Sequence, residues 1–255
     1  MTDENWRLRQ GPKVFIVGAP RSGTSILLFA LKDVFGLPGF GESHVMPAFQ
    51  RMVHHLRAYV NSLEGSPDPI MLKRLDRIEL EQHVFAYIRH FYAAQFPQGR
   101  WVDKTPTGEA VFGLPLIESI FPGSRLIATK RNGIEVIVSH QKKFKSTFEE
   151  ACQSWLSAMQ GLLHARQGCQ NLLEVDQFDL LNNSVEVANK VASHLGFESR
   201  ADRLSQYFLT HRVERSSTYD GSSKLRLADT SWSAADQEKF KSMCGSMMLE
   251  FGYEI

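Results

Sequence analysis

The segment KVFIVGAPRSGTSILLFAL, from Lys13 to Leu31, constrains the fold of this chain more than any other part of the sequence. It begins with the apolar, β-branched run Val14 to Val17, which is typical of a strand buried on both faces of a parallel sheet. A short loop with Gly18 and Gly23 follows, and the residues after it are apolar with helical spacing. The segment therefore predicts a strand, a tight loop and a helix over residues 25–35.

The rest of the chain continues this alternation of strands and helices. After a helical stretch at approximately 47–98, the apolar runs RWVDK, SRLIATKR and NLLEV predict three further strands, each followed by a helical pattern. The last helix begins after Ser233, a residue type that is preferred at the N-cap. Strands that alternate with helices form a parallel sheet with right-handed crossovers. We therefore predict a single α/β domain over 1–255, a central parallel sheet flanked by helices, with a helical insertion at about 47–98.

The composition argues against several classes of protein. The 255 residues carry a formal charge of only +1, so we expect no nucleic-acid partner, and any anion site is local. No apolar run approaches the roughly 20 residues that cross a bilayer, and the first ten residues lack a secretory signal, so we expect a cytoplasmic protein without a membrane span. Three widely spaced cysteines predict neither a disulfide framework nor a metal site. The oligomeric state is not indicated.

The loop after the first strand has the features of an anion-binding loop. Gly18 and Gly23 allow tight turns, and the backbone N–H groups of residues 21–25 open the following helix. The lysine of the nucleoside-triphosphate motif GxxxxGK[ST] is missing, because Thr24 stands in its place. Arg21 instead supplies a permanently charged, planar fork. This loop predicts a phosphate or sulfate site that works without a metal.

A second anion motif follows a later strand, in TKRNGIEVIVSH. Arg131 lies just past the strand, and Ser139 lies eight residues further, a little over two helical turns. Both groups can therefore approach one ligand from the strand end and the helix. Together with the first loop in the same sheet, the motif predicts a ligand with phosphate at two separated places.

These two motifs resemble those of the sulfotransferases that use 3′-phosphoadenosine 5′-phosphosulfate (PAPS). That family has a 5′-phosphosulfate loop, PRSGTT or PKSGTT, and a 3′-phosphate motif with Arg and Ser eight residues apart; here they read APRSGTS and RNGIEVIVS. The resemblance implies a P-loop-like three-layer sandwich and PAPS as co-substrate. It assigns the 5′ end of the nucleotide to Arg21, Ser22, Gly23, Thr24 and Ser25, and the 3′-phosphate to Arg131 and Ser139.

Further segments are similar to the tyrosylprotein sulfotransferase branch. GESHVMP resembles the segment that carries the catalytic glutamate, here Glu42, and DKTP the strand end with a catalytic lysine, here Lys104. VERSS resembles a late loop whose serine, here Ser216, touches the cofactor, and Lys224 follows it. The chain departs from that branch where basic residues receive an acidic peptide, because His44 and Ala48 stand there. The resemblance therefore implies a soluble, bacterial member with its own acceptor.

The implied reaction is an in-line transfer of a sulfuryl group to an acceptor hydroxyl or amine, with Glu42 as base and with Lys104 and Arg21 stabilising charge. His44 is an alternative base. Two other functions stay open. One is a kinase for a small metabolite, which needs ATP, magnesium and a carboxylate such as Asp103; the other is a nucleotide sensor that keeps both anion sites without catalysis. The sequence does not distinguish a small molecule, sugar, lipid or peptide tyrosine as acceptor.

Overall fold

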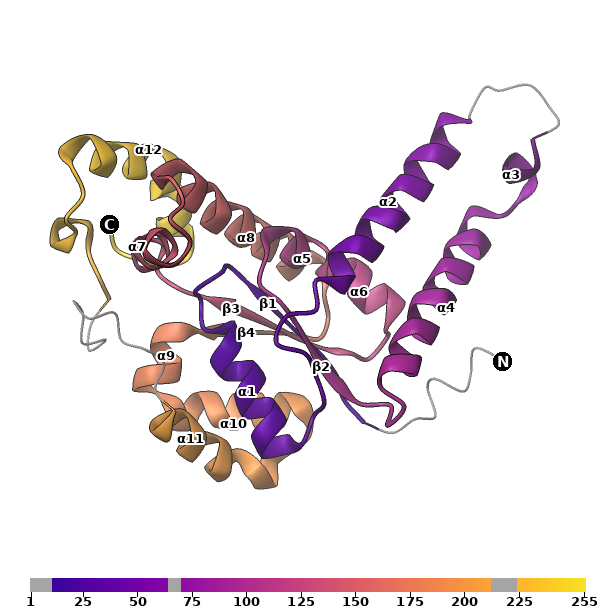
Figure 1. Cartoon of the computed structure of the whole chain (residues 1–255), viewed down its shortest axis with the longest axis horizontal. Helices are drawn as coiled ribbons and strands as arrows, with labels where there is room; N and C mark the ends of the chain where they lie inside the picture. Colours follow the sequence, from indigo (N-terminus) through magenta and orange to yellow (C-terminus); the bar gives the residue numbers. More distant parts are fainter. Residues whose placement is uncertain (1–10, 64–69, 212–223) are drawn as a thin grey trace.

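A computed structural model describes residues 11–63, 70–211 and 224–255 of the chain. Its described strands form one parallel sheet in the order β2-β1-β3-β4 (Figure 1). The strands are β1 (Lys13–Gly18), β2 (Trp101–Thr105), β3 (Arg125–Lys130) and β4 (Leu172–Asp176). Each lies where an apolar run predicts it, and the predicted parallel α/β sheet is confirmed. Because β1 lies between β2 and β3, the carboxyl ends of these three strands meet at one edge.

Helices cover both faces of the sheet, because the side chains of β1 alternate between two cores. Val14 and Ile16 pack into one hydrophobic cluster, and Phe15 and Val17 into the other. The first cluster is covered by α1 (Thr24–Phe35), α9 (Gln177–Asn182), α10 (Ser184–Leu195) and α11 (Ala201–Thr210). The second is covered by α5 (Gly108–Phe112), α6 (Leu114–Ile120), α7 (Gly133–Phe144), α8 (Phe148–Gly168) and α12 (Ala234–Glu250). Short 3₁₀ helices span Glu198–Arg200 and Leu227–Asp229.

The predicted helical insertion consists of α2 (Val45–Ser62), α3 (Met71–Arg74) and α4 (Arg77–Gln95). In Figure 1, α2 and α4 lie next to each other as an arm that projects from the sheet. A bidentate ion pair between Arg57 and Glu81 joins them. The carboxyl-terminal part of α4 packs into the core through Phe85, Ile88 and Tyr92, and this packing anchors the arm beside β1 and β2.

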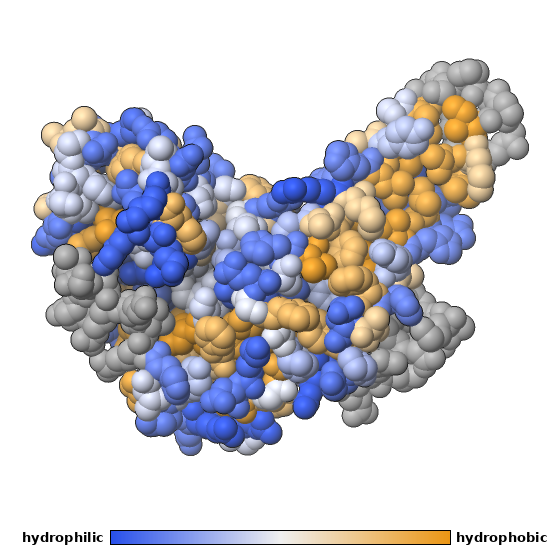
Figure 2. All heavy atoms as spheres, in the orientation of Figure 1, coloured by the Kyte–Doolittle hydropathy of each residue, from blue (hydrophilic) through white to orange (hydrophobic). Residues whose placement is uncertain are grey.

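Figure 2 shows apolar surface along this arm. Exposed apolar or aromatic side chains on it include Tyr59, Met71, Ile78 and Tyr87. Among the described helices, none combines the length and apolar character that crossing a bilayer needs.

Candidate active site

The predicted anion loop lies at the carboxyl edge of the sheet, between the end of β1 and the start of α1. Gly18 has a φ of 151° and lies so close to Thr129 of β3 that a Cβ would collide with it, so only glycine fits. Gly23, with a φ of 95°, precedes the first turn of α1. Arg21 also has a positive φ, 71°, which is uncommon for a residue with a side chain. The backbone here is shaped for a tight turn into a helix.

Ser22 supports the loop from inside the protein. Its side chain is fully buried, donates to the carbonyl of Ala19 at 2.6 Å, and hydrogen-bonds the hydroxyl of Thr129, also at 2.6 Å. The structure therefore places this hydroxyl between the loop and β3. Thr24 is buried as well, whereas Ser25 is exposed at the amino end of α1.

The ammonium group of Lys104 contacts both Ser25 and Glu42. The Nζ of Lys104 donates to Ser25 Oγ at 3.1 Å and to Glu42 Oε1 at 2.9 Å. The other oxygen of Glu42, Oε2, lies 3.0 Å from Nε2 of His44. The Lys104 side chain is only 3% exposed and that of Glu42 is 47% exposed, so the lysine is fixed while the carboxylate faces solvent. The structure thus brings together the predicted base, its alternative and the predicted catalytic lysine.

The pKa of Glu42 lies below its ordinary value. Partial burial raises this pKa, but the hydrogen bonds to Lys104 and His44 and the positive charge of Lys104 outweigh that effect. Glu42 is therefore ionised at neutral pH, which is the state that can accept a proton.

A buried carboxylate behind the site holds the segment that carries Glu42. Asp103 is 5% exposed and accepts hydrogen bonds from Ser43 Oγ, at 2.7 and 2.8 Å, and from the hydroxyl of Tyr92, at 2.6 Å. The backbone N–H of Ser43 donates to the carbonyl of Lys104 at 3.2 Å. The side chains of Asp103 and Lys104 thus lie on opposite faces of β2, since side chains alternate along a strand.

This arrangement bears on the kinase alternative, which needs Asp103 as a magnesium ligand. Burial raises the pKa of the Asp103 carboxyl, and the hydrogen bonds from Tyr92 and Ser43 lower it in part. Both carboxylate oxygens already accept hydroxyl donors on the face of β2 away from Ser25. The geometry does not favour a kinase.

The two predicted anion motifs contact each other. Arg21 Nε donates to Ser139 Oγ at 3.0 Å, and Arg131 Nη1 donates to the carbonyl of Arg21, also at 3.0 Å. Arg131 also forms an ion pair with Glu135, at 2.7 Å from its Nε to Oε2. Residues that lie more than a hundred positions apart in the sequence therefore lie together at the carboxyl edge of the sheet, as the pairing of β1 with β3 requires.

Sequence reasoning missed two residues that attach the segment beginning at Lys224 to the start of α7. Glu135 Oε1 accepts from the backbone N–H of Leu225, and Asn132 Nδ2 donates to the carbonyl of Leu225, both at 3.0 Å. Both are buried polar residues, Asn132 at the N-cap of α7 and Glu135 in its first turn, and polar residues at these positions are the signal that could have identified them. As a result, Lys224 lies at the end of β4, with its Nζ 3.9 Å from Asp176 Oδ2.

A cavity of about 660 Å³ lies where Lys224 and Leu225 meet the start of α7. Its lining includes Asn132, Phe178, Lys224 and Leu225. Its volume lies within the range of small-molecule and cofactor sites. Ser216, which the sequence places in the late loop, lies outside the described residues. Within the described ranges, no cluster of three or more His, Cys, Asp or Glu side chains is arranged to hold a metal ion.

The site residues fall within a segment that a protein-family comparison recognises. The model of the sulfotransferase family matches residues 12–202 of the chain. The chain belongs to the sulfotransferase family. Both anion motifs, Glu42 and Lys104 lie inside the matched segment of this sulfotransferase, and Lys224 lies beyond it.

Solved structures share the fold of this sulfotransferase. The sulfotransferase domain of the Synechococcus PCC 7002 olefin synthase matches with a TM-score of 0.57 and 20% identity, over 96% of this chain and 95% of that one. Sulfotransferase STF9 from Mycobacterium avium matches with a TM-score of 0.55 and 13% identity, over 96% and 78% of the two chains. STF1 from Mycobacterium tuberculosis gives 0.50 and 16%, over 96% and 79%. No curated protein sequence matches this sulfotransferase.

Proposed function

We propose that this sulfotransferase transfers the sulfuryl group of PAPS to a hydroxyl or amine of its acceptor. The observation that carries the proposal is the contact of Arg21 with both Ser139 and Arg131. It joins an anion loop at a helix amino end to a second cationic motif, which is the arrangement that a nucleotide with two separated phosphates needs. The acceptor class and the tyrosylprotein branch stay predictions.

The residues present fit such a nucleotide. Arg131 uses Nε and Nη1 within the protein, and a guanidinium has five N–H donors, so donors remain for a phosphate. Lys224 adds a second positive charge beside the cavity of about 660 Å³. When bound, PAPS supplies the sulfuryl group and a 5′-phosphate leaving group. Arg131 and Ser139 would hold its 3′-phosphate, and the amino end of α1 its 5′ end.

Glu42 is the proposed base. Its carboxylate is half exposed and ionised, so it can take the proton of an acceptor hydroxyl on an Oε atom. General-base assistance of this kind contributes a factor of about 10²–10⁴ in rate. His44 remains the alternative, since its Nε2 is within hydrogen-bond distance of the same carboxylate.

Lys104 is the proposed electrostatic group. Its ammonium is held by Ser25 and Glu42, and it has a third N–H donor. A cation fixed in a water-poor position stabilises developing negative charge more strongly than a mobile surface cation does. The contact of Lys104 with Ser25, in the first turn of α1, supports a role for this lysine beside the 5′ end of the nucleotide.

Titration calorimetry tests the nucleotide. We expect adenosine 3′,5′-bisphosphate to bind without magnesium and ATP to bind poorly; binding of ATP alone, and only with magnesium, would overturn the proposal in favour of a kinase.

A turnover assay with PAPS and a panel of phenols, alcohols, amines and peptides tests the base. Glu42→Gln should lower kcat by about 10²-fold or more while leaving the bisphosphate affinity unchanged. Glu79→Gln, an exposed glutamate on α4, is the matched control and should behave as wild type. If Glu42→Gln retains full activity, Glu42 is not the base and His44 becomes the better candidate. Nucleotide binding without turnover on any acceptor would favour the sensor.

A further inference from the structure

The segment that carries Glu42, between α1 and α2, lies along β2. The backbone N–H of Val102 donates to the carbonyl of Pro38 at 2.9 Å, and the N–H of Ser43 donates to the carbonyl of Lys104 at 3.2 Å. These two bonds fix the path of the chain but not the direction of its side chains. Because the Glu42 side chain is 47% exposed, a further contact is needed to keep its carboxylate in one place.

Two neighbouring residues of this segment contact two neighbouring residues of β2. Glu42 Oε1 accepts from Lys104 Nζ at 2.9 Å, and Ser43 Oγ lies 2.7 and 2.8 Å from the two carboxylate oxygens of Asp103, to which it donates. Asp103 is 5% exposed. A hydrogen bond to a buried charged group stabilises more than an ion pair with an exposed partner does. The Ser43 contact is therefore the stronger of the two.

The residue after Ser43 has a strained backbone. His44 has a φ of 51°, in the left-handed region, which costs free energy for a residue with a side chain. Beyond this turn, Ser43 Oγ also accepts from the backbone N–H of Val45, the first residue of α2, at 3.4 Å. The turn places Nε2 of His44 3.0 Å from Glu42 Oε2. One hydroxyl thus connects the buried carboxylate of β2 with the start of α2 across the strained turn.

From these contacts we propose that Ser43 is a positioning residue for Glu42. Its hydroxyl, held by Asp103, keeps the Glu42 carboxylate on the ammonium of Lys104. Without this hydroxyl the backbone bond of Ser43 remains, but the turn at His44 loses a support and the carboxylate is free to leave Lys104 for solvent. The inference rests on the proposed function, because it needs Glu42 as the base.

The ¹⁵N signal of the Lys104 ammonium tests the contact in the full chain without any substrate. This side chain is 3% exposed and donates to Ser25 and Glu42, so its signal reports whether the carboxylate is in place. Glu42→Gln calibrates the shift that follows from losing the carboxylate. Ser43→Ala should move the signal in the same direction, and Ser43→Thr, which keeps a hydroxyl, should leave it near the wild-type position.

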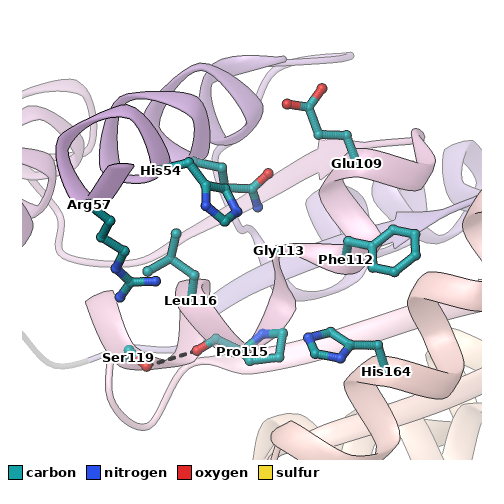
Figure 3. Close-up of a pocket in the computed structure, with 10 residues that line it drawn as sticks. His54, Arg57, Glu109, Phe112, Gly113, Pro115, Leu116, Ser119 and His164 are labelled. Carbon is teal, nitrogen blue, oxygen red and sulfur yellow. Dashed lines mark hydrogen bonds between the residues drawn. The ribbon is translucent and has the colours of Figure 1, made fainter. Parts of the chain in front are cut away.

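Ser119→Ala is the matched control. Ser119 is an exposed serine of α6, and its hydroxyl donates to the carbonyl of Pro115 at 2.9 Å beside a separate cavity of about 330 Å³ (Figure 3). This variant should leave the Lys104 signal unmoved. The proposal is overturned if Ser43→Ala also leaves it unmoved. Should Ser43→Ala fail to fold, Ser43→Cys, whose thiol is only a weak donor, takes its place with the same expected shift.

Turnover of PAPS with the same panel of acceptors tests the consequence for the reaction. Ser43→Ala should lower kcat about tenfold, the loss expected when one hydrogen bond to a charged group is missing, and should leave the affinity for adenosine 3′,5′-bisphosphate unchanged. Ser43→Thr should restore kcat. In the Glu42→Gln background, Ser43→Ala should cause no further loss, because a positioning residue acts only through the residue that it positions.

A further loss of about tenfold in that background would overturn the proposal. If the wild-type chain turns over no acceptor, the proposed sulfuryl transfer fails, whereas the Lys104 signal still decides whether Ser43 holds Glu42 in place.

Discussion

Replacing Tyr92 with phenylalanine removes one hydroxyl from the buried group behind the candidate active site and keeps the packed ring. The hydroxyl donates to Asp103 Oδ2 at 2.6 Å, and the carboxylate is 5% exposed, so water cannot readily take its place. A hydrogen bond to a charged group contributes about 1.5–3 kcal/mol. We expect Tyr92→Phe to lower the free energy of unfolding by about that amount, and the Tm by about 3–12 °C.

The loss should depend on pH. Burial raises the pKa of Asp103, and the Tyr92 hydrogen bond lowers it in part, so the variant has a still higher Asp103 pKa in its folded state. A carboxyl whose pKa is raised by folding binds its proton more tightly in the folded state, which stabilises that state as the pH falls through the raised pKa. The variant gains more from this protonation than wild type does. The difference in stability is therefore largest near neutral pH and shrinks in acid.

Urea unfolding at about pH 7.5 and at about pH 5 measures both effects. Tyr87→Phe is the matched control, because Tyr87 lies on the same helix, is 59% exposed and should lose almost nothing. An equal loss in both variants, or a loss in Tyr92→Phe that grows as the pH falls, would refute the reasoning.

Two further predictions concern other groups. Arg131→Lys should weaken adenosine 3′,5′-bisphosphate about tenfold in calorimetry, because an ammonium cannot replace a guanidinium that contacts Glu135 and Arg21 and, in the proposed complex, a phosphate as well; unchanged affinity would remove Arg131 from the proposed nucleotide site. Burial, with a smaller effect from Glu118, raises the pKa of Cys169 to about 12, so iodoacetamide at about pH 8 should label it about a thousandfold more slowly than an ordinary cysteine. Rapid labelling of Cys169, seen by mass spectrometry, would contradict this.

The sequence predicts the strands well and some helices poorly, for a physical reason. A strand buried on both faces is a continuous apolar run, so β1 and β3 are visible without their neighbours. Helix α9 has six residues, too few to show a helical period, and α11 buries a serine, Ser205, on its inner face. Neither helix was predicted.

Within the site, the contacts between motifs were predictable and the supports were not. Adjacent parallel strands place their carboxyl ends together, so the meeting of Arg21 with Ser139 follows from the topology. The contact of Ser43 with Asp103 depends on how residues 38–44 cross β2, and the inward hydroxyl of Ser22 depends on a threonine of β3. Such contacts carry no local sequence signal.

The ion pair between Lys104 and Glu42 has a consequence for the timing of the proposed reaction. While Glu42 is ionised, its negative charge offsets much of the positive charge of the Lys104 ammonium. Once the acceptor's proton arrives, the carboxyl becomes neutral and that attraction largely disappears. The lysine then acts with its full charge at the stage when negative charge grows on the departing oxygen. In the proposed reaction, deprotonation of the acceptor and electrostatic assistance to the leaving group are thereby linked through one short contact.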